Sequence, residues 1–120
     1  MKTKISLYTF LLVVVCSTIA QAQTKIVKAN IKVYGNCVMC KKRIETALDH
    51  TGIKQAQWDP KTKELQVVYN SAKITELQIH ELIASAGHDT DQVKAKDEVY
   101  ASLPFCCLYR DHDHTPGNNH

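Results

Sequence analysis

Cys37 and Cys40 enclose the segment Cys-Val-Met-Cys, which follows an alternating apolar run and precedes a run with helical spacing. The pattern predicts that a strand ends just before the pair and a helix begins at it. Unpaired N–H groups and the positive end of the helix dipole lower the pKa of a thiol at such a position, and Lys41, Lys42 and Arg43 add positive charge. Two thiolates at this spacing suit a soft metal ion, a redox disulfide or a structural disulfide.

The N-terminus has the pattern of a secretory signal peptide over residues 1–22. Two lysines precede an apolar stretch over residues 5–19, and the small residues of Ala-Gln-Ala end at Ala22. Polar residues interrupt the apolar stretch, so it is too short for a permanent membrane span. We expect cleavage after Ala22, which discards Cys16 and leaves a periplasmic or secreted chain with no other membrane attachment.

Cleavage leaves 98 of the 120 residues, with 13 of the 15 basic residues against 12 acidic ones. This length supports one domain, and the balanced charge gives no electrostatic case for binding nucleic acid. An exported chain reaches an oxidising compartment, where the remaining cysteines can pair as disulfides in any of three ways. These cysteines are Cys37, Cys40, Cys106 and Cys107.

The first half of the mature chain predicts a strand, a helix and a hairpin. Residues 25–34 alternate between apolar and polar side chains, as in a half-buried strand. Apolar residues then recur every three or four positions, which indicates an amphipathic helix over residues 40–50. Strands over residues 53–58 and 64–69 flank an Asp-Pro-containing turn at residues 59–63.

The second half predicts one helix and one strand. Thr75 with Gln78 has the capping-box pattern, and Gly87 follows the last residue of an apolar stripe, so the helix covers residues 75–86. The last strand over residues 88–95 is supported only by Val93 and Ala95. The order is βαββαβ, an α+β fold of the split βαβ or ferredoxin-like kind, with two helices on one face of an antiparallel sheet.

This order, with Cys37 and Cys40 on the loop between the first strand and the first helix, resembles the heavy-metal-associated domain family. The family includes small copper chaperones, periplasmic mercury-binding proteins and modules of metal-transporting ATPases. The resemblance places the domain at residues 23–95 and implies that Cys37 and Cys40 bind a soft ion, most often Cu(I), with Hg(II) or Zn(II) as alternatives. It also implies a metal-transporting ATPase or another metal acceptor protein as the partner.

The chemistry of Cys37 and Cys40 also favours a soft ion such as Cu(I). Thiolates prefer Cu(I), which accepts a low coordination number, whereas Zn(II) requires four ligands in a tetrahedron. An ion held by two sulfurs remains open to a thiolate of a partner, so it can pass by ligand exchange. No chemical transformation is needed, and we therefore expect a carrier or scavenger and not an enzyme.

The sequence departs from the family pattern at the loop. The family usually has a buried Met at the position of Gly35, where it anchors the loop. Three consequences are open: a more mobile loop, or compensating packing by Tyr34 or by Met39. We expect Met39 to be a loop side chain and not a thioether ligand, and Trp58 to pack in the core or at its rim.

Histidines give the site a further candidate. His88 directly follows Gly87 on a loop that approaches the metal loop in this fold. It is either a third ligand or a solvent-facing side chain. His50 and His80 lie on helical stretches, where exposure is the expectation.

Residues 96–120 form a C-terminal extension beyond the family domain. A short helix over residues 97–103 is expected to stop at Pro104, and apolar neighbours indicate that the following Cys106 and Cys107 dock on the domain. The two thiols have four interpretations: a disulfide to the first pair, a second set of ligands that makes up to four thiolates, an independent surface site, or inert packing. The last residues form a polar tail whose histidines bind metal weakly or are simply solvated: His112, His114 and His120.

Two alternatives to a metal carrier remain. In a thiol–disulfide oxidoreductase, Cys37 would attack and Cys40 would resolve the mixed disulfide. The loop lacks the Trp-Cys-Gly-Pro-Cys character of thioredoxin-like proteins, and the order of elements differs from theirs. The other alternative is a disulfide-stabilised domain that binds protein partners.

Overall fold

The computed structural model describes residues 25–111. Its elements, in chain order, are β1 (Ile26–Lys32), α2 (Val38–Ala47), β2 (Ile53–Trp58), β3 (Glu64–Asn70), α3 (Glu76–Ser85), α4 (Asp97–Ala101) and a 3₁₀ turn (Phe105–Cys107). No helix among these residues is long and apolar enough to cross a membrane. The expectations for the signal peptide at 1–22, for Cys16 and for the tail residues His112, His114 and His120 lie outside the described residues and stay predictions.

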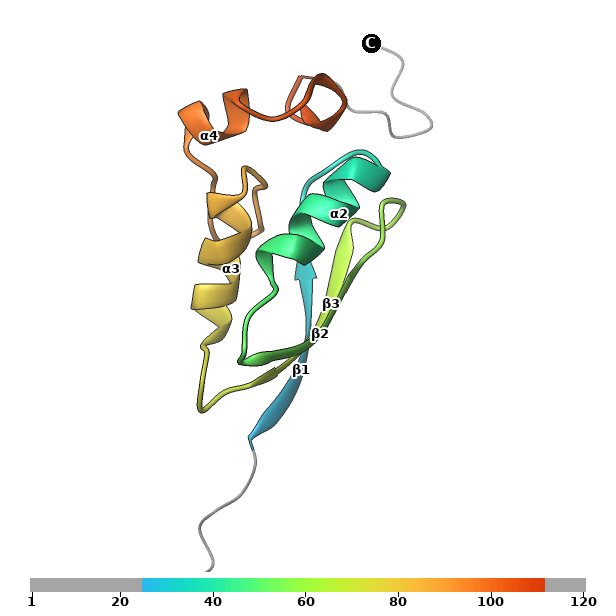
Figure 1. The fold of residues 1–120 in the computed structure, drawn as a ribbon. Coiled ribbons are helices and arrows are strands. Elements are labelled where there is room, and N and C mark those ends of the chain that lie inside the picture. Colours follow the sequence, from blue (N-terminus) through green and yellow to red (C-terminus); the bar gives the residue numbers. More distant parts are fainter. Residues whose placement is uncertain (1–24, 112–120) are drawn as a thin grey trace, which may run out of the picture.

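The sheet is antiparallel, with β3 between β1 and β2. Its register pairs Ile31 with Leu65 and Ala29 with Val67, so the apolar residues of neighbouring strands share one face. α2 lies against that face with α3 beside it (Figure 1). Fully or almost fully buried side chains between sheet and helices include Ile31, Val33, Ile44, Trp58, Leu65, Val67, Ile79 and Ile83. The predicted α+β class is confirmed.

The fourth strand expected at residues 88–95 does not form. Only an isolated bridge joins Val33 to Thr90, and the sheet has three strands. The Thr90 hydroxyl accepts hydrogen bonds from the backbone N–H groups of Gln92 and Val93, at 3.2 and 3.0 Å. These local bonds fold the segment into a turn and so compete with pairing to β1.

The helices begin and end close to the predicted positions. α2 starts at Val38, two residues earlier than expected, and so includes Cys40 in its first turn. At α3 the capping box is confirmed: the N–H of Gln78 donates to Thr75 Oγ1, and the Gln78 side chain accepts from the Thr75 N–H. Gly87 follows the helix with φ of +100°, a conformation that favours glycine.

His80 is buried, so the expectation of an exposed side chain is wrong. It is 1% exposed, because the 88–95 turn covers this face of α3. Its Nδ1 lies 2.6 Å from the Thr90 hydroxyl, which gives the buried ring a polar partner.

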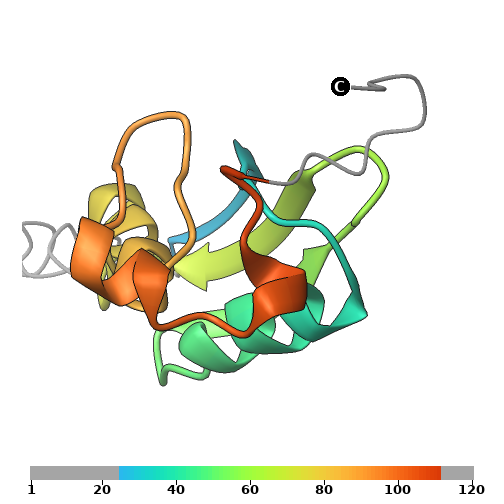
Figure 2. The same cartoon turned by 90° about the horizontal axis from the view of Figure 1, so that it is seen from above.

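The C-terminal extension crosses one end of the domain. α4 lies at the end of α3, and the 3₁₀ turn lies over the start of α2 (Figure 2). α4 is shorter than the predicted 97–103 helix, and Pro104 precedes the 3₁₀ turn, as its missing N–H favours. The extension therefore docks on the end of the domain that carries Cys37 and Cys40.

Candidate metal centre

Two thiols stand at the start of α2. Cys37 immediately precedes the helix and Cys40 belongs to its first turn, with their Sγ atoms 3.7 Å apart. Cys40 is fully buried and accepts a hydrogen bond from the N–H of Asn36 at 3.3 Å, whereas Cys37 is partly exposed. One sulfur of the pair is thus reachable from solvent and the other is anchored in the protein.

The helix start favours the thiolate form of Cys37. Burial by itself raises the pKa of Cys37, but interactions with the backbone N–H groups of Cys40 and Met39 outweigh it, and the pKa lies below its ordinary value. The first-turn N–H groups have no partners within the helix and are available to a negative sulfur. The sequence argument for a low-pKa thiol at this position agrees with the geometry.

Cys107 brings a third sulfur to the pair. The Sγ atoms of Cys37, Cys40 and Cys107 all lie within 4.8 Å of one another, and Cys107 is fully buried. Burial raises the pKa of Cys107 above its ordinary value, and its hydrogen bond with Cys40 and the charge of that residue add to the effect. We call these three atoms the sulfur group.

The spacing of the sulfur group suits one soft ion. With metal–sulfur bonds of about 2.3 Å, three sulfurs around an ion in one plane lie about 4.0 Å apart. The 3.7 Å between Cys37 and Cys40 is close to this value. Three thiolates form a coordination set for Cu(I), whereas a tetrahedral Zn(II) site needs a fourth ligand, which residues 25–111 do not add to the group.

The Cys residues of the described chain are all unbridged. Cys37, Cys40, Cys106 and Cys107 are free thiols, and the 3.7 Å between the first two sulfurs exceeds the roughly 2.05 Å of a disulfide bond. The same distance is short enough for oxidation to link them after a small side-chain rotation. The arrangement can therefore hold an ion or, chemically, form a disulfide.

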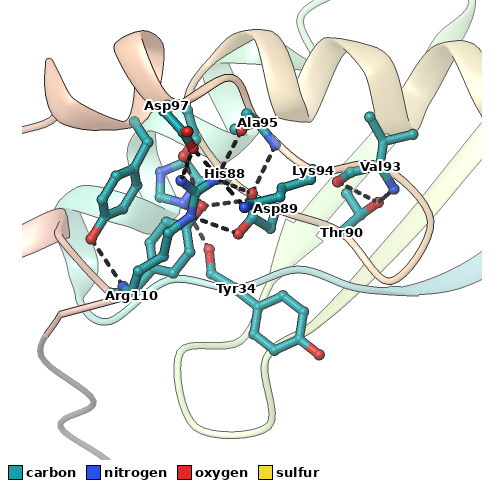
Figure 3. Close-up of polar contacts among 12 residues, drawn as sticks. Tyr34, His88, Asp89, Thr90, Val93, Lys94, Ala95, Asp97 and Arg110 are labelled. Atoms are coloured by element: carbon teal, nitrogen blue, oxygen red, sulfur yellow. Dashed lines mark hydrogen bonds and ion pairs between the residues drawn. The ribbon is translucent and has the colours of Figure 1, made fainter.

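An ion pair fastens the extension beside the sulfur group. Arg110 donates from Nη2 and Nε to the two carboxylate oxygens of Asp89, at 2.7 and 3.0 Å, and also to the Ala95 carbonyl and to Asp97 (Figure 3). Bidentate pairs of this kind are among the stronger hydrogen-bonded contacts in proteins. We call the Asp89–Arg110 pair the clasp.

Tyr109 adds a second attachment. Its hydroxyl donates to the Gly87 carbonyl and accepts from the Asp89 N–H, both at 2.8 Å, and its ring stacks on His88 with centroids 5.3 Å apart. Because Tyr109 and Arg110 lie only two and three residues after Cys107, these contacts fix the position of Cys107.

His88 is fully buried, so the expectation of a solvent-facing histidine is wrong. Its Nδ1 lies 2.8 Å from the Tyr34 carbonyl oxygen, which only accepts, so Nδ1 carries the proton. Burial lowers the pKa of His88, and the ring is neutral at pH 7. Its nitrogens are not in the sulfur group, so the geometry gives no support to a third ligand at this position.

Cys106 is exposed and is not one of the three clustered sulfurs, although its Sγ lies 3.9 Å from that of Cys107. Its thiol donates to the Met39 thioether sulfur at 3.4 Å, and its backbone carbonyl oxygen lies 3.6 Å from the Cys37 sulfur. Of the two cysteines in the extension, the structure therefore brings only Cys107 into the sulfur group.

Residues 36–89 match the family model of the heavy-metal-associated domain. This part of the chain is a heavy-metal-associated domain. It contains Cys37, Cys40 and His88, and it ends before α4. The domain boundaries predicted at residues 23 and 95 stay predictions.

Solved structures resemble more than half of the chain. A putative copper-ion-binding protein from Bacillus anthracis str. Ames is 21% identical, with a TM-score of 0.54, over 57% of this chain and all of that one. The CopZ metallochaperone and a copper-binding domain from HMA7, a P-type ATPase, are each 26% identical, with TM-scores of 0.52 and 0.51, over 53% of this chain and 98% and 89% of theirs. No curated protein matches the chain.

In this heavy-metal-associated domain, the Trp58 ring packs against the loop at Gly35. A side-chain carbon added at Gly35 would lie 3.0 Å from the Trp58 ring and 3.1 Å from Cys40 Cβ. Trp58 is 1% exposed and donates from Nε1 to the Val33 carbonyl oxygen at 3.0 Å. Tyr34 and Met39 are both exposed, so neither side chain compensates.

Asp89, Tyr109 and Arg110 were not among the site residues predicted from the sequence. A Tyr-Arg dipeptide just after a Cys-Cys pair is the only local signal, and it indicates no partner. Asp89 is one of 12 acidic residues, and nothing in the sequence marks it as the partner of a side chain 21 positions away.

Proposed function

We propose that this protein binds one soft metal ion of the Cu(I) class through Cys37, Cys40 and Cys107 and serves as an exported carrier or scavenger. The observation that carries the proposal is the clustering of three Sγ atoms within 4.8 Å at the start of α2. The names of two relatives at 26% identity, a metallochaperone and a copper-binding domain of a P-type ATPase, support the choice of copper. Hg(II) is also a soft ion and competes for the same thiolates.

The mechanism is ligand exchange. Each thiol that binds the ion releases its proton to solvent, and no electron is transferred. A thiolate of an acceptor, such as a metal-transporting ATPase, approaches at Cys37, the most accessible sulfur of the group. The acceptor's bond forms before a bond to this chain breaks, so the ion is never free. The protein is a binding protein in this proposal and catalyses no reaction.

The third thiolate favours retention. An ion with two ligands is open to attack, whereas Cys107 fills a coordination position from the buried side of the extension. Transfer then requires that one of three bonds yields to the acceptor. We infer that this chain holds its ion more tightly than it would with Cys37 and Cys40 alone.

The proposal is tested by competition for Cu(I) between the reduced mature chain and a chelator that becomes coloured when it binds Cu(I). The experiment is done under anaerobic conditions. One Cu(I) per chain should resist the chelator, and the double variant Cys37→Ser, Cys40→Ser should lose this tight binding. Cys106→Ser, which removes a thiol outside the sulfur group, is the matched control and should retain the first ion. Full affinity in the double variant would refute the assignment.

The low-pKa thiol at Cys37, with Cys40 at 3.7 Å, gives the oxidoreductase alternative a specific observation. An insulin-reduction assay distinguishes the two functions. Turnover that depends on Cys37, from a chain that binds no Cu(I) when reduced, would favour the enzyme. Fractionation of the native cell tests the proposed export separately, by locating the mature chain.

A further inference from the structure

Two further sulfur atoms, those of Cys106 and Met39, lie at the surface next to the sulfur group. The Cys106 Sγ is 3.4 Å from the Met39 Sδ, and Met39 is 51% exposed although it is apolar. Met39 comes from the first turn of α2 and Cys106 from the 3₁₀ turn, so the docked extension creates this contact. The sequence argument treated Met39 as a loop side chain only, because nothing in the sequence brings Cys106 to it.

The surface pair is continuous with the sulfur group. Cys106 Sγ lies 3.9 Å from Cys107 Sγ, and the Cys107 sulfur lies within 4.8 Å of both Cys37 and Cys40. A path of sulfur atoms therefore leads from the solvent-exposed Met39 to the fully buried Cys40. Each step along it is short enough for one ion to contact sulfurs on both sides.

The chemistry of these two sulfur donors determines which metal ion they bind. Met39 offers a neutral thioether, and Cys106 offers a thiolate once its proton has passed to solvent. Soft sulfur donors of both kinds suit Cu(I), and a pair of them accepts the low coordination number of this ion. Because the pair has only two donors, one of them neutral, it holds an ion more weakly than the three thiolates of the sulfur group do.

We propose that Cys106 and Met39 form a second, outer site for Cu(I)-class ions, at which the ion binds on its way to or from the sulfur group. Movement from the outer site to the inner one makes a bond to Cys107, whose proton passes to solvent, and breaks one to Met39, with no change in oxidation state. This inference rests on the proposed function, because it requires that the sulfur group is the inner site.

The test uses the full mature chain, reduced, with selective carbon-13 labelling of the methionine methyl group and Ag(I) as the probe. Ag(I) is a soft ion that stays in one oxidation state. The first equivalent should leave the Met39 methyl resonance almost unmoved, and the second should shift it. Native mass spectrometry should count two ions on the wild type and one on Met39→Leu and on Cys106→Ser.

Val38→Leu is the matched control, because Val38 is an exposed apolar neighbour of Met39 without a sulfur atom. It should keep both ions. Far-UV circular dichroism of each variant checks that it folds, and the exposed positions make loss of the fold unexpected. In Cys37→Ser, Cys40→Ser the Met39 resonance should shift with the first equivalent.

Several results would overturn the inference. A wild type that binds one ion while the Met39 resonance stays fixed in excess Ag(I) would do so. So would a second ion that survives both Met39→Leu and Cys106→Ser, since it must then bind elsewhere. A chain that binds no first ion contradicts the proposed function itself, and this outcome is recognised by the absence of any tightly bound Ag(I).

Discussion

Cys37 and Cys107 belong to one sulfur group but have opposite surroundings. Interactions with backbone N–H groups outweigh the effect of burial at Cys37 and lower its pKa, whereas burial and the neighbouring thiol raise the pKa of Cys107. Cys37 therefore releases its proton more readily than Cys107. An ion that binds Cys107 must therefore displace a proton that is held more tightly than the one on Cys37.

The Trp58 ring leaves no room for a side chain at position 35, so a larger residue there should destabilise the fold. Gly35→Ala should lower the free energy of unfolding by about 1–3 kcal/mol, because the new methyl group meets the buried Trp58 ring at 3.0 Å. The same substitution should cost less in a Trp58→Phe background, since phenylalanine lacks the ring atoms that make the contact. Urea unfolding of the four reduced proteins measures both costs, and equal costs in the two backgrounds would contradict this role of Trp58.

Among the elements, the extension matters because it carries one atom of the sulfur group and is attached to the domain through other residues. The 3₁₀ turn brings Cys107, and the clasp holds the next turn of chain against the loop after α3. Both partners of the clasp are mostly buried, at 20% and 16% exposed, so loss of one leaves the other poorly solvated.

Arg110→Gln should release the extension and expose Cys107. In the metal-free chain, the Cys107 thiol should then react with an alkylating agent about ten times faster or more, since about 1.4 kcal/mol of lost docking energy already gives a tenfold change and hydrogen bonds to charged groups contribute roughly 1.5–3 kcal/mol. Peptide mapping by mass spectrometry measures the rate. Asp97→Asn is the control, because Asp97 is 86% exposed and contributes only a peripheral contact. Unchanged protection of Cys107 in Arg110→Gln would show that the clasp does not hold the extension.

The clasp should also respond to acid. Burial by itself raises the pKa of Asp89, but hydrogen bonds from Arg110 and from the Ala95 N–H outweigh it and hold the pKa below its ordinary value. A carboxyl group whose pKa is lowered in the folded state stabilises that state fully at pH values above the pKa of the unfolded chain, which is about 4. This stabilisation is lost as the pH falls from there through the lower pKa of the folded state. The protection factor of the Asp89 amide against hydrogen exchange should therefore fall in this range for the wild type, because this amide donates to Tyr109. In Asp89→Asn the protection should be weak at every pH; an equal acid response in both proteins would contradict this role.

For the protein as a whole, the sequence predicted what depends on local pattern. The hairpin of β2 and β3, the capping box at Thr75 and the helix start beside the cysteine pair all follow from residues within a few positions of one another. The strand at 88–95 failed because the Thr90 hydroxyl binds its own backbone, a competition that periodicity does not reveal. The sequence predicted that Cys106 and Cys107 dock on the domain, but it left their role open, since the position of Cys107 depends on a contact between Asp89 and Arg110 that no periodic pattern encodes.

The same distinction applies to function. The order of elements around the Cys-x-x-Cys pair predicted a heavy-metal-associated domain, and residues 36–89 match its family model, but this match ends before the segment that carries the third sulfur. In the proposed function, the extension thus adds a third ligand to the two that the domain carries. A chain ending at residue 95 would keep Cys37 and Cys40 and lose Cys107.

X-ray absorption spectroscopy of the reduced chain with one equivalent of Cu(I) tests the coordination set directly, because it counts the atoms bound to the ion. We predict three sulfur neighbours in the wild type and two in Cys107→Ser. Two sulfur neighbours in both proteins would contradict the assignment of Cys107, and nitrogen or oxygen neighbours in place of sulfur would contradict the thiolate site altogether.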